Sequence, residues 1–464
     1  MKEKTASYRD FPKQFWLVIV FEFFERGSYY GMMSVLSIYL TEILGFSKES
    51  VGVIKSVIQP LLYFLPILSG AIADRLGYRK TLMYAFGLLG TGYFLTSQMT
   101  EYAAVFASLM VMGIGAGTFK PIISGTIAKV TNEKNSTLGF GIFYWSINFG
   151  AFLFPLIIVP FLKNIDWRYV MIASALGTGL MLIPTIFFFK EPKREVQAKE
   201  PLMKVVKHIF LKIGEVASNW RFMLFILIYS LFWILYFQMF DSVLWYFQTF
   251  VNAEPLNKFI SGIVGFNWAF DVEHITVINA LTIILLQLFI SSIVKNFKAM
   301  PTIITGFFFG TLGMLILAIS NSVWVLLIGI TVFSFGEMIA HPKYISYLGT
   351  IAPQDKKATY MGFGFLYGVF GAGIGGVLGA NLYVKLIDNP MLDFIKVKTA
   401  ALGSALQDNI QINDAIQFAE KAGVSKDTIL QQAHSSEFWI IFGCIGVLAI
   451  ILLLIYEKLI GTKH

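Results

Sequence analysis

Residues 12–41 read PKQFWLVIVFEFFERGSYYGMMSVLSIYLT, an apolar run with three charged side chains near its middle. A helix needs about 20 residues to cross the roughly 30 Å hydrocarbon core of a bilayer. Apolar runs of about this length follow one another along most of the 464-residue sequence. Because every backbone polar group inside a membrane must be paired within its own segment, these runs predict membrane-spanning α-helices.

The composition supports the same fold class. Hydrophobic residues make up 56% of the chain, charged residues make up 14%, and the mean hydropathy is +0.69. This is more apolar surface than a soluble core can bury. The 40 glycines suit helices that pack closely in a membrane, whereas the alternating pattern of a membrane β-barrel is not visible. We therefore expect an all-α membrane protein with about twelve transmembrane helices.

The expected helices fall into two groups of six. The twelve spans are residues 12–41, 51–73, 80–98, 101–128, 138–163, 167–190, 219–250, 272–296, 300–320, 323–350, 357–388 and 436–458. Residues 1–190 and 219–464 are predicted to form two six-helix bundles, joined by a cytoplasmic linker at 191–218. Within the second bundle, the helix-like pattern of the polar segment 388–435 favours a small extracellular helical cap over a disordered loop.

Basic residues predict the orientation in the membrane. Arg75, Arg79 and Lys80 lie in one short loop, Lys295 and Lys298 lie in another, and these loops alternate with loops poorer in positive charge. Because cytoplasmic loops carry such an excess, we expect a multi-pass protein of the inner (plasma) membrane with both termini in the cytoplasm. The net charge of +8 then reflects topology and not nucleic-acid binding.

The charges of the first span must face a polar interior, because a lone charge is costly inside a membrane. Glu22, Glu25, Arg26, Tyr29 and Tyr30 recur at helical spacing and share one face. A carboxylate beside an arginine can exchange a proton when an anionic substrate competes for the guanidinium. The pattern predicts proton coupling at this face, and the alternative is a structural ion pair that locks two helices together.

Lys120 in the fourth span has no acidic residue within one helical turn. Its partner is therefore expected on another helix or on a ligand. The alternative is a lysine whose ammonium reaches the cytoplasmic boundary. Arg26 and Lys120 together would suit the carboxylate of a substrate.

The second half carries acidic residues inside its spans, Asp241 in the seventh and Glu337 in the tenth. A cavity with cationic and acidic walls would orient a zwitterion such as a short peptide. His341 is equally compatible with a proton relay and with a helix contact. For Lys343 we favour a structural role, either paired with Glu337 or reaching the cytoplasmic rim.

The loop after the second span, from Gly70 to Lys80, contains Asp74 and Arg75 at the membrane edge. Its glycines allow close helix contact, and its carboxylate lies beside basic residues. We interpret Asp74 and Arg75 as elements of a gate and of topology, not of a binding site.

Over nearly its whole length the chain resembles the proton-dependent oligopeptide transporters (the POT, or peptide transporter, family) of the major facilitator superfamily. The loop from Gly70 to Lys80 resembles the general signature of the superfamily. The more specific likeness lies in Glu22-x-x-Glu25-Arg26 with Tyr29 and Tyr30. The remaining matches are Tyr63, the run from Phe143 to Gly150 with Asn148, Asn279, Gly336-Glu337, Pro342 and Ala352-Pro353.

The resemblance implies a role for each matching residue. Glu22 and Glu25 would serve proton coupling, and Arg26 with Lys120 would receive the peptide carboxylate. Tyr63, Asn148 and Asn279 would line the peptide site together with Tyr29 and Tyr30, and Glu337 would meet the peptide amino group.

The chain departs from the family pattern at several positions. Span seven has Phe237 before Gln238 where the family usually has a glutamate. Gln238 is kept as a substrate-binding candidate, and Asp241, one turn on, is a candidate to replace the missing acidic partner of Lys120. Gly364 stands where a tryptophan is expected in span eleven, Gly27 stands where a phenylalanine is expected, and His341 and Lys343 replace small or apolar residues. The linker is too short for the extra helix pair of many bacterial members.

The function predicted from these residues is proton-coupled import of di- and tripeptides by alternating access, driven by the proton gradient without a cofactor or metal. A carrier for another organic anion or a modified amino acid is the alternative. The five histidines are scattered, so an enzyme is disfavoured, and nothing resembles the filter of a channel. The expected partners are a small substrate, protons and the lipid bilayer, with the monomer as the functional form.

Overall fold

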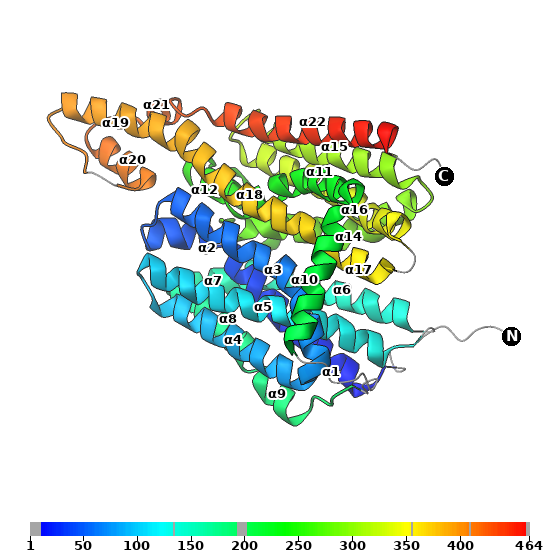
Figure 1. Cartoon of the computed structure of the whole chain (residues 1–464). Helices are drawn as coiled ribbons and strands as arrows, with labels where there is room; N and C mark the ends of the chain where they lie inside the picture. Colours follow the sequence, from blue (N-terminus) through cyan, green and yellow to red (C-terminus); the bar gives the residue numbers. More distant parts are fainter. Residues whose placement is uncertain (1–10, 133–134, 193–201, 354–355, 408–409, 461–464) are drawn as a thin grey trace. The chain divides into compact units, whose positions relative to one another are not determined.

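The computed structural model describes residues 11–132, 135–192, 202–353, 356–407 and 410–460, and the regular structure within these ranges is helical (Figure 1). The expected all-α fold is thus confirmed. The chain divides into two compact units. Unit 1 comprises Met1–Met33, Ile58–Met223 and Ala352–Val369, and unit 2 comprises Ser34–Val57, Leu224–Ile351 and Phe370–His464. The predicted boundaries at 190 and 219 follow the sequence halves and stay a prediction.

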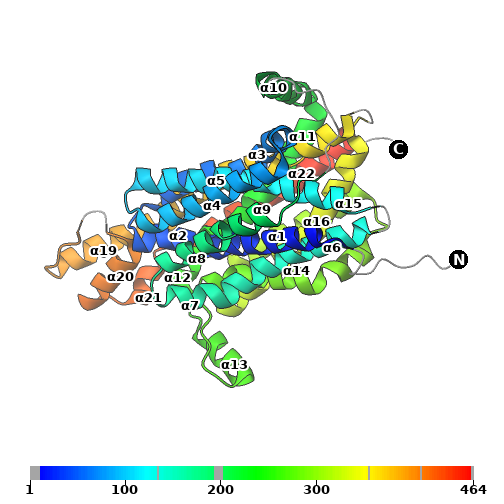
Figure 2. The same ribbon diagram turned by 90° about the horizontal axis from the view of Figure 1, so that it is seen from below.

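Unit 1 contains most helices of the first half of the chain together with one short stretch of the second half. They are α1 (Lys13–Met33), the later part of α3 (Lys48–Leu76), α4 (Tyr78–Gln98), α5 (Tyr102–Val130), α6 (Ser136–Leu153), a π-helix (Phe154–Ile158), α7 (Val159–Lys163), α8 (Arg168–Gly179), α9 (Leu182–Phe187), α10 (Leu202–Ser218), the start of α11 (Trp220–Phe237), α17 (Lys357–Phe363) and the first residues of α18 (Leu366–Tyr383). The predicted linker holds α10, which stands apart in Figure 2, while residues 193–201 lie outside the described ranges.

Small residues let the helices of unit 1 approach closely. The helix α1 packs against α6 and α8, and α4 packs against α5 and α8. A Cβ atom added to Gly150 of α6 would lie 2.8 Å from the carbonyl oxygen of Phe23 in α1. A Cβ atom on Gly115 of α5 would lie 2.8 Å from the backbone nitrogen of Leu89 in α4. Glycine at these crossings permits the close packing on which membrane helices depend.

The space beside Gly27, the position where a phenylalanine is expected, is filled by the ring of another phenylalanine. A Cβ atom at Gly27 of α1 would collide with the ring of Phe154, the first residue of the π-helix after α6. The Phe154 ring thus fills the space beside position 27.

Unit 2 contains the remaining helices. They are α2 (Leu36–Ile38), a π-helix (Tyr39–Ile43), the first part of α3, most of α11, a 3₁₀ turn (Gln238–Phe240), α12 (Ser242–Phe250), α13 (Glu254–Val264), α14 (Glu273–Val294), α15 (Ala299–Leu317), α16 (Val323–Ile351), most of α18, a π-helix (Val384–Asp388), α19 (Asn389–Ala401), α20 (Ile412–Lys421), α21 (Lys426–Leu430) and α22 (Ser435–Leu459). The helix α15 packs against α16 and α22 (Figures 1 and 2), and α19 to α21 lie within the polar segment 388–435.

Ten helical stretches of the described residues are long and apolar enough to cross a membrane. The expected spans 12–41 and 80–98 are not among these ten. The helix α1 within the first of them carries Glu22, Glu25 and Arg26, and α4 begins with Arg79 and Lys80 next to its first residue. The charges lower the hydropathy of α1, whereas α4 after Lys80 is uncharged, and its lower hydropathy comes from its threonines, glycines, tyrosines, serine and glutamine.

Candidate functional site

The charged face of α1 forms a buried cluster in unit 1. Glu22, Glu25 and Arg26 are each no more than 4% exposed. The Arg26 guanidinium donates two hydrogen bonds to the Glu25 carboxylate, from Nε to Oε2 and from one terminal nitrogen to Oε1, the second at 2.5 Å. Glu22 Oε1 lies 3.7 Å from Arg26 Nε, while Glu22 Oε2 has no hydrogen-bond partner among the described residues. One guanidinium is therefore shared by two carboxylates, and one carboxylate oxygen is left unpaired.

Three tyrosines lie near this cluster. The Tyr29 ring lies 5.1 Å from the Arg26 Cζ atom, and the Tyr29 and Tyr30 ring centroids are 5.3 Å apart. Tyr93 of α4 is fully buried within electrostatic range of Glu25 and Arg26. Its hydroxyl has no hydrogen-bond partner in the described part of the chain. The sequence analysis did not single out Tyr93, because a tyrosine in an apolar run carries no sequence signal.

Lys120 of α5 lies in the same unit as the cluster. Its ammonium stands over the ring of Tyr63 in α3, 5.1 Å from the centroid, and it is close enough to Arg26, Glu25 and Glu22 to interact with their charges. No carboxylate oxygen of a described residue lies within 4.0 Å of the ammonium. The structure thus holds a largely covered cation without an ion-pair partner.

The start of α18 packs against the Tyr63 ring. A Cβ atom on Gly368 would collide with this ring, and the Tyr367 ring centroid is 5.9 Å from that of Tyr63. The sequence could not predict this contact, because the contact depends on which helix packs against α3. Asn148 of α6, also predicted to line the site, donates Nδ2–H to the carbonyl oxygen of Tyr144 at 2.9 Å.

The expected loop from Gly70 to Lys80 is mostly helical, because α3 continues to Leu76 and α4 begins at Tyr78, so that Gly77 alone separates them. Asp74 and Arg75, the residues predicted to act in gating, are exposed in the last turn of α3. The Asp74 carboxylate lies 4.0 Å from the Lys129 ammonium at the end of α5. The Glu191 carboxylate accepts hydrogen bonds from the backbone nitrogens of Tyr78 and Arg79, at 2.7 and 3.0 Å. These nitrogens begin α4, where unpaired N–H groups favour an anion. The gating role stays a prediction.

In unit 2, Glu337 of α16 is joined to Asn279 of α14. Asn279 Nδ2 donates to Glu337 Oε2 at 3.0 Å and to Ser334 Oγ at 2.9 Å. The structure therefore brings together two residues to which the family resemblance gives roles, Glu337 for the peptide amino group and Asn279 for the lining of the site.

His341 and Lys343 lie further along α16. His341 Nδ1 is 3.2 Å from the Tyr229 hydroxyl, and its ring packs edge to face on Trp233. Lys343 Nζ donates to the carbonyl oxygens of Lys295 and Phe297, at 3.0 and 2.7 Å. Lysine binding carbonyls at the end of a helix is a common way to pair groups that the helix leaves open. Lys343 thus binds backbone carbonyls after α14, and within the described residues it forms no ion pair with Glu337, so its predicted structural role stays a prediction.

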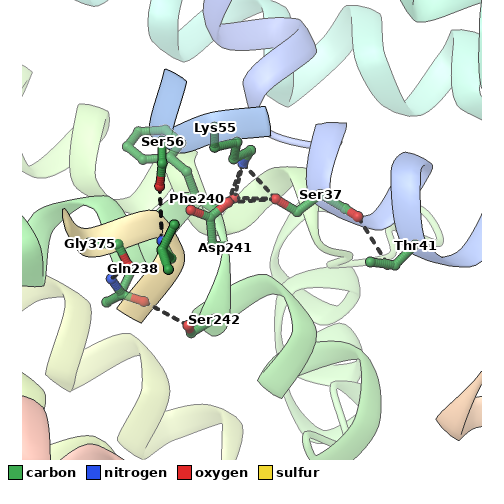
Figure 3. A network of polar contacts seen from close by, with 10 residues as sticks. Ser37, Thr41, Lys55, Ser56, Gln238, Phe240, Asp241, Ser242 and Gly375 are labelled. Carbon is green, nitrogen blue, oxygen red and sulfur yellow. Dashed lines mark hydrogen bonds and ion pairs between the residues drawn. The ribbon is translucent and has the colours of Figure 1, made fainter. Parts of the chain in front are cut away.

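The seventh span bends at Asp241. The helix α11 ends in a 3₁₀ turn, Asp241 leaves the helical region with φ −133° and ψ −88°, and α12 begins at Ser242. Gln238 in the turn donates to the carbonyl oxygens of Ile234 and Gly375, both at 3.0 Å, and accepts from Ser242 (Figure 3). Its carboxamide is thus engaged by the protein, so binding substrate there would require these bonds to exchange.

Asp241 is bound by Lys55, a residue the sequence analysis did not single out (Figure 3). Lys55 Nζ donates to Asp241 Oδ1, to Ser37 Oγ at 2.5 Å and to the carbonyl oxygen of Phe240 at 2.7 Å. Ser37 Oγ also lies 2.7 Å from Asp241 Oδ1. Lys55 and Asp241 are 1% and 3% exposed. Asp241, proposed above as a replacement partner for Lys120, is thus occupied by another lysine.

A second buried lysine lies two turns earlier in α3. Lys48 Nζ donates to both carboxylate oxygens of Asp388, at 2.8 and 2.6 Å. The Lys48 ammonium also lies 4.4 Å from the Tyr383 ring centroid and 5.7 Å from that of Trp245. Lys48 and Lys55 are seven residues apart and therefore lie on one helix face. Through them α3 is joined to the regions around α12 and α18 by two buried ion pairs.

Three comparisons with known proteins bear on this arrangement. The model for the Major Facilitator Superfamily matches residues 16–376. The dipeptide and tripeptide permease B of Aliivibrio fischeri is 30% identical over 227 residues, 47% of this chain and 45% of that protein. The permease B of Yersinia enterocolitica is 28% identical over 223 residues, 47% of this chain and 42% of that protein. The matched region thus spans less than half the length of these relatives.

Solved structures resemble the chain over almost its full length. A POT family transporter in complex with 5-aminolevulinic acid has a TM-score of 0.71 at 19% identity, covering 97% of both chains. A POT family transporter in complex with a thioalcohol-conjugated peptide has a TM-score of 0.73 at 19% identity, covering 98% of this chain and 99% of that chain. The nucleoside transporter NupG has a TM-score of 0.71 at 14% identity, covering 96% and 100%. At these identities the likeness concerns the fold alone.

Proposed function

The chain belongs to the Major Facilitator Superfamily, a family of membrane transporters and not of enzymes, and from this premise we propose that it is a proton-coupled symporter of di- and tripeptides. The proposal agrees with the resemblance drawn from the sequence motifs and with the similarity to dipeptide and tripeptide permeases. Transport would proceed by alternating access of two six-helix halves.

The observation that carries the proposal is the unpaired ammonium of Lys120 over Tyr63. A covered cation that forms no direct ion pair with a described residue is costly, and a ligand carboxylate would reduce that cost. Arg26 lies within electrostatic range of Lys120. A peptide carboxylate is therefore a fitting partner for this part of unit 1.

Proton coupling would follow from the shared guanidinium of Arg26. When a substrate carboxylate competes for Arg26, Glu22 or Glu25 loses its cationic partner. A carboxylate left alone in a membrane interior is stabilised by taking up a proton. Binding of the peptide anion and uptake of a proton would thus favour each other. The pair of Glu337 and Asn279 in unit 2 offers an acidic acceptor for the peptide amino group.

Span seven favours a second candidate, a carrier for another organic anion or a modified amino acid. Phe237 replaces the usual acidic residue, and the Gln238 carboxamide is bonded within the protein. A substrate without a peptide bond would require fewer hydrogen bonds from the side chains at these positions. The POT family structure that holds 5-aminolevulinic acid shows that such a ligand is compatible with that transporter.

We further propose that the chain acts as a monomer in the inner (plasma) membrane, with both termini cytoplasmic, and that it needs no cofactor besides the proton gradient. Within the described residues no group of three or more His, Cys, Asp and Glu side chains is arranged to hold a metal ion. The basic loops support the orientation.

The proposed function is tested by uptake into liposomes that contain the purified protein, under an imposed inward proton gradient. Labelled dipeptides, tripeptides, single amino acids and organic anions are compared. Accumulation of di- and tripeptides above the outside concentration is expected. Accumulation of organic anions or amino acids alone would support the second candidate, and no gradient-driven accumulation of any of them would overturn the proposal.

A further inference from the structure

Gln59 in α3 is a buried side-chain amide without hydrogen bonds. It is 2% exposed, and neither its Nε2 nor its Oε1 atom has a partner within the part of the chain that the structure describes. Most buried polar atoms in proteins are paired, because an unpaired one loses its hydrogen bonds to water without replacement. A carboxamide with both its donor and its acceptor unpaired therefore calls for a ligand.

Other polar side chains along α3 are engaged. Lys55, one turn before Gln59, binds Asp241, and Ser56 Oγ accepts from the backbone nitrogen of Val377 at 2.9 Å. Ser69 Oγ donates to the carbonyl oxygen of Gly117 at 3.0 Å. These three side chains thus have hydrogen-bond partners from other segments, whereas Gln59 has none among the described residues.

The position of Gln59 relates it to the proposed carboxylate site. Tyr63 follows Gln59 by four residues, so the two side chains leave α3 on the same face, one turn apart. The Lys120 ammonium lies 5.1 Å from the Tyr63 ring centroid. Tyr63 therefore lies one helical turn from Gln59 on α3 and beside the Lys120 ammonium of α5, all within unit 1.

We propose that Gln59 binds the peptide bond of the substrate, and this inference rests on the proposed function. Gln59 Nε2 would donate to the peptide carbonyl oxygen, and Gln59 Oε1 would accept the peptide N–H. A carboxamide presents a donor and an acceptor side by side, as a peptide bond does. Protein atoms cover both Gln59 atoms in this conformation, so the bonds form when this face of α3 opens to substrate. Gln59 would then make the protein bind peptides more tightly than molecules of the same length that lack the amide.

The test compares two ligands that differ only at the amide. Glycylglycine and 5-aminolevulinate have the same length and the same charged ends, but a CH₂ group replaces the peptide N–H in 5-aminolevulinate. Dissociation constants of both are measured for the wild type, Gln59→Leu and Gln59→Met. Gln98→Leu serves as the control, because Gln98 is exposed at the end of α4.

The wild type and the control are expected to prefer glycylglycine by about tenfold, the effect of one hydrogen bond that leaves its partner unpaired when lost. Gln59→Leu and Gln59→Met are expected to weaken glycylglycine binding by about tenfold or more and to reduce the preference to within about twofold. Equal weakening of both ligands, or an unchanged preference, would overturn the inference.

If neither variant folds, the wild type alone decides, because equal binding of the two ligands by the wild type would also overturn it. Failure of the proposed function is distinguishable, since the wild type would then take up no peptide at all.

Discussion

Lys55 and Asp241 form a buried ion pair at the bend between α11 and α12, and the carbonyl oxygen of Phe240 and the hydroxyl of Ser37 complete it (Figure 3). The bend frees the Phe240 carbonyl from the helical ladder, and the Lys55 ammonium binds it. Asp241 is thereby fixed inside unit 2. Asp241, which the sequence suggested as the acidic partner of Lys120, thus has Lys55 as its own cation.

Removing one partner of this pair is expected to destabilise the protein. Lys55→Ala leaves the Asp241 carboxylate buried without its cation, and we expect the free energy of unfolding in detergent to fall by about 3–5 kcal/mol. The double variant Lys55→Met with Asp241→Leu removes both charges and should regain most of that loss. Equal destabilisation by the single and double variants would contradict the pairing.

Lys120 is expected to behave in the opposite way. Lys120→Ala removes a cation that forms no direct ion pair with a described residue, so the free energy of unfolding should change little, while dipeptide affinity should drop by about 30-fold or more because the ligand carboxylate loses its partner. Binding of a dipeptide with an amidated carboxyl end should change little. Isothermal titration with both ligands measures this.

The matched control for this prediction is Lys129→Ala, nine residues further along α5, where the ammonium is 4.0 Å from the exposed Asp74 carboxylate. It should leave dipeptide affinity unchanged. A loss of affinity for both ligands at Lys120→Ala would assign this lysine a structural role.

Sequence reasoning identified the α1 cluster because three charges in an apolar run violate the usual composition of a span. Glu22, Glu25 and Arg26 are buried together as that argument requires. Glu337 and Asn279 also lie in contact. These residues carry a signal in their type, since charged or amide groups inside a membrane need partners.

Other parts of the site were outside the reach of the sequence. Lys55 lies near the start of an expected span, where a lysine ordinarily extends to the membrane surface. Its burial depends on Ser37 and on the bend at Asp241, and the local sequence predicts neither of these contacts. The empty hydrogen-bonding positions of Gln59 and Tyr93 are likewise visible only when tertiary neighbours are known.

Position 27 offers a test of the packing in unit 1. Gly27→Phe places a ring where the Phe154 ring lies, and we expect a loss of about 1–3 kcal/mol in the free energy of unfolding, or more. Combining Gly27→Phe with Phe154→Ala should recover part of the loss, because one ring then replaces the other. A double-mutant cycle of thermal or chemical unfolding checks this, and strictly additive effects would contradict the contact.

The measurement that tests the central claim most directly is the movement of protons when peptide is added. Proteoliposomes containing a pH-sensitive dye are prepared without a pH gradient, and a dipeptide is added outside. The wild type is expected to acidify the lumen as labelled dipeptide enters.

The variant Glu25→Gln is expected to exchange labelled for unlabelled dipeptide across the membrane but to move no protons, because the carboxylate beside Arg26 can no longer take up a proton. Glu254→Gln, at an exposed ion pair with Lys258 in α13, is the control and should acidify the lumen as the wild type does. Dipeptide entry into wild-type liposomes without acidification, or unchanged acidification by Glu25→Gln, would contradict the account.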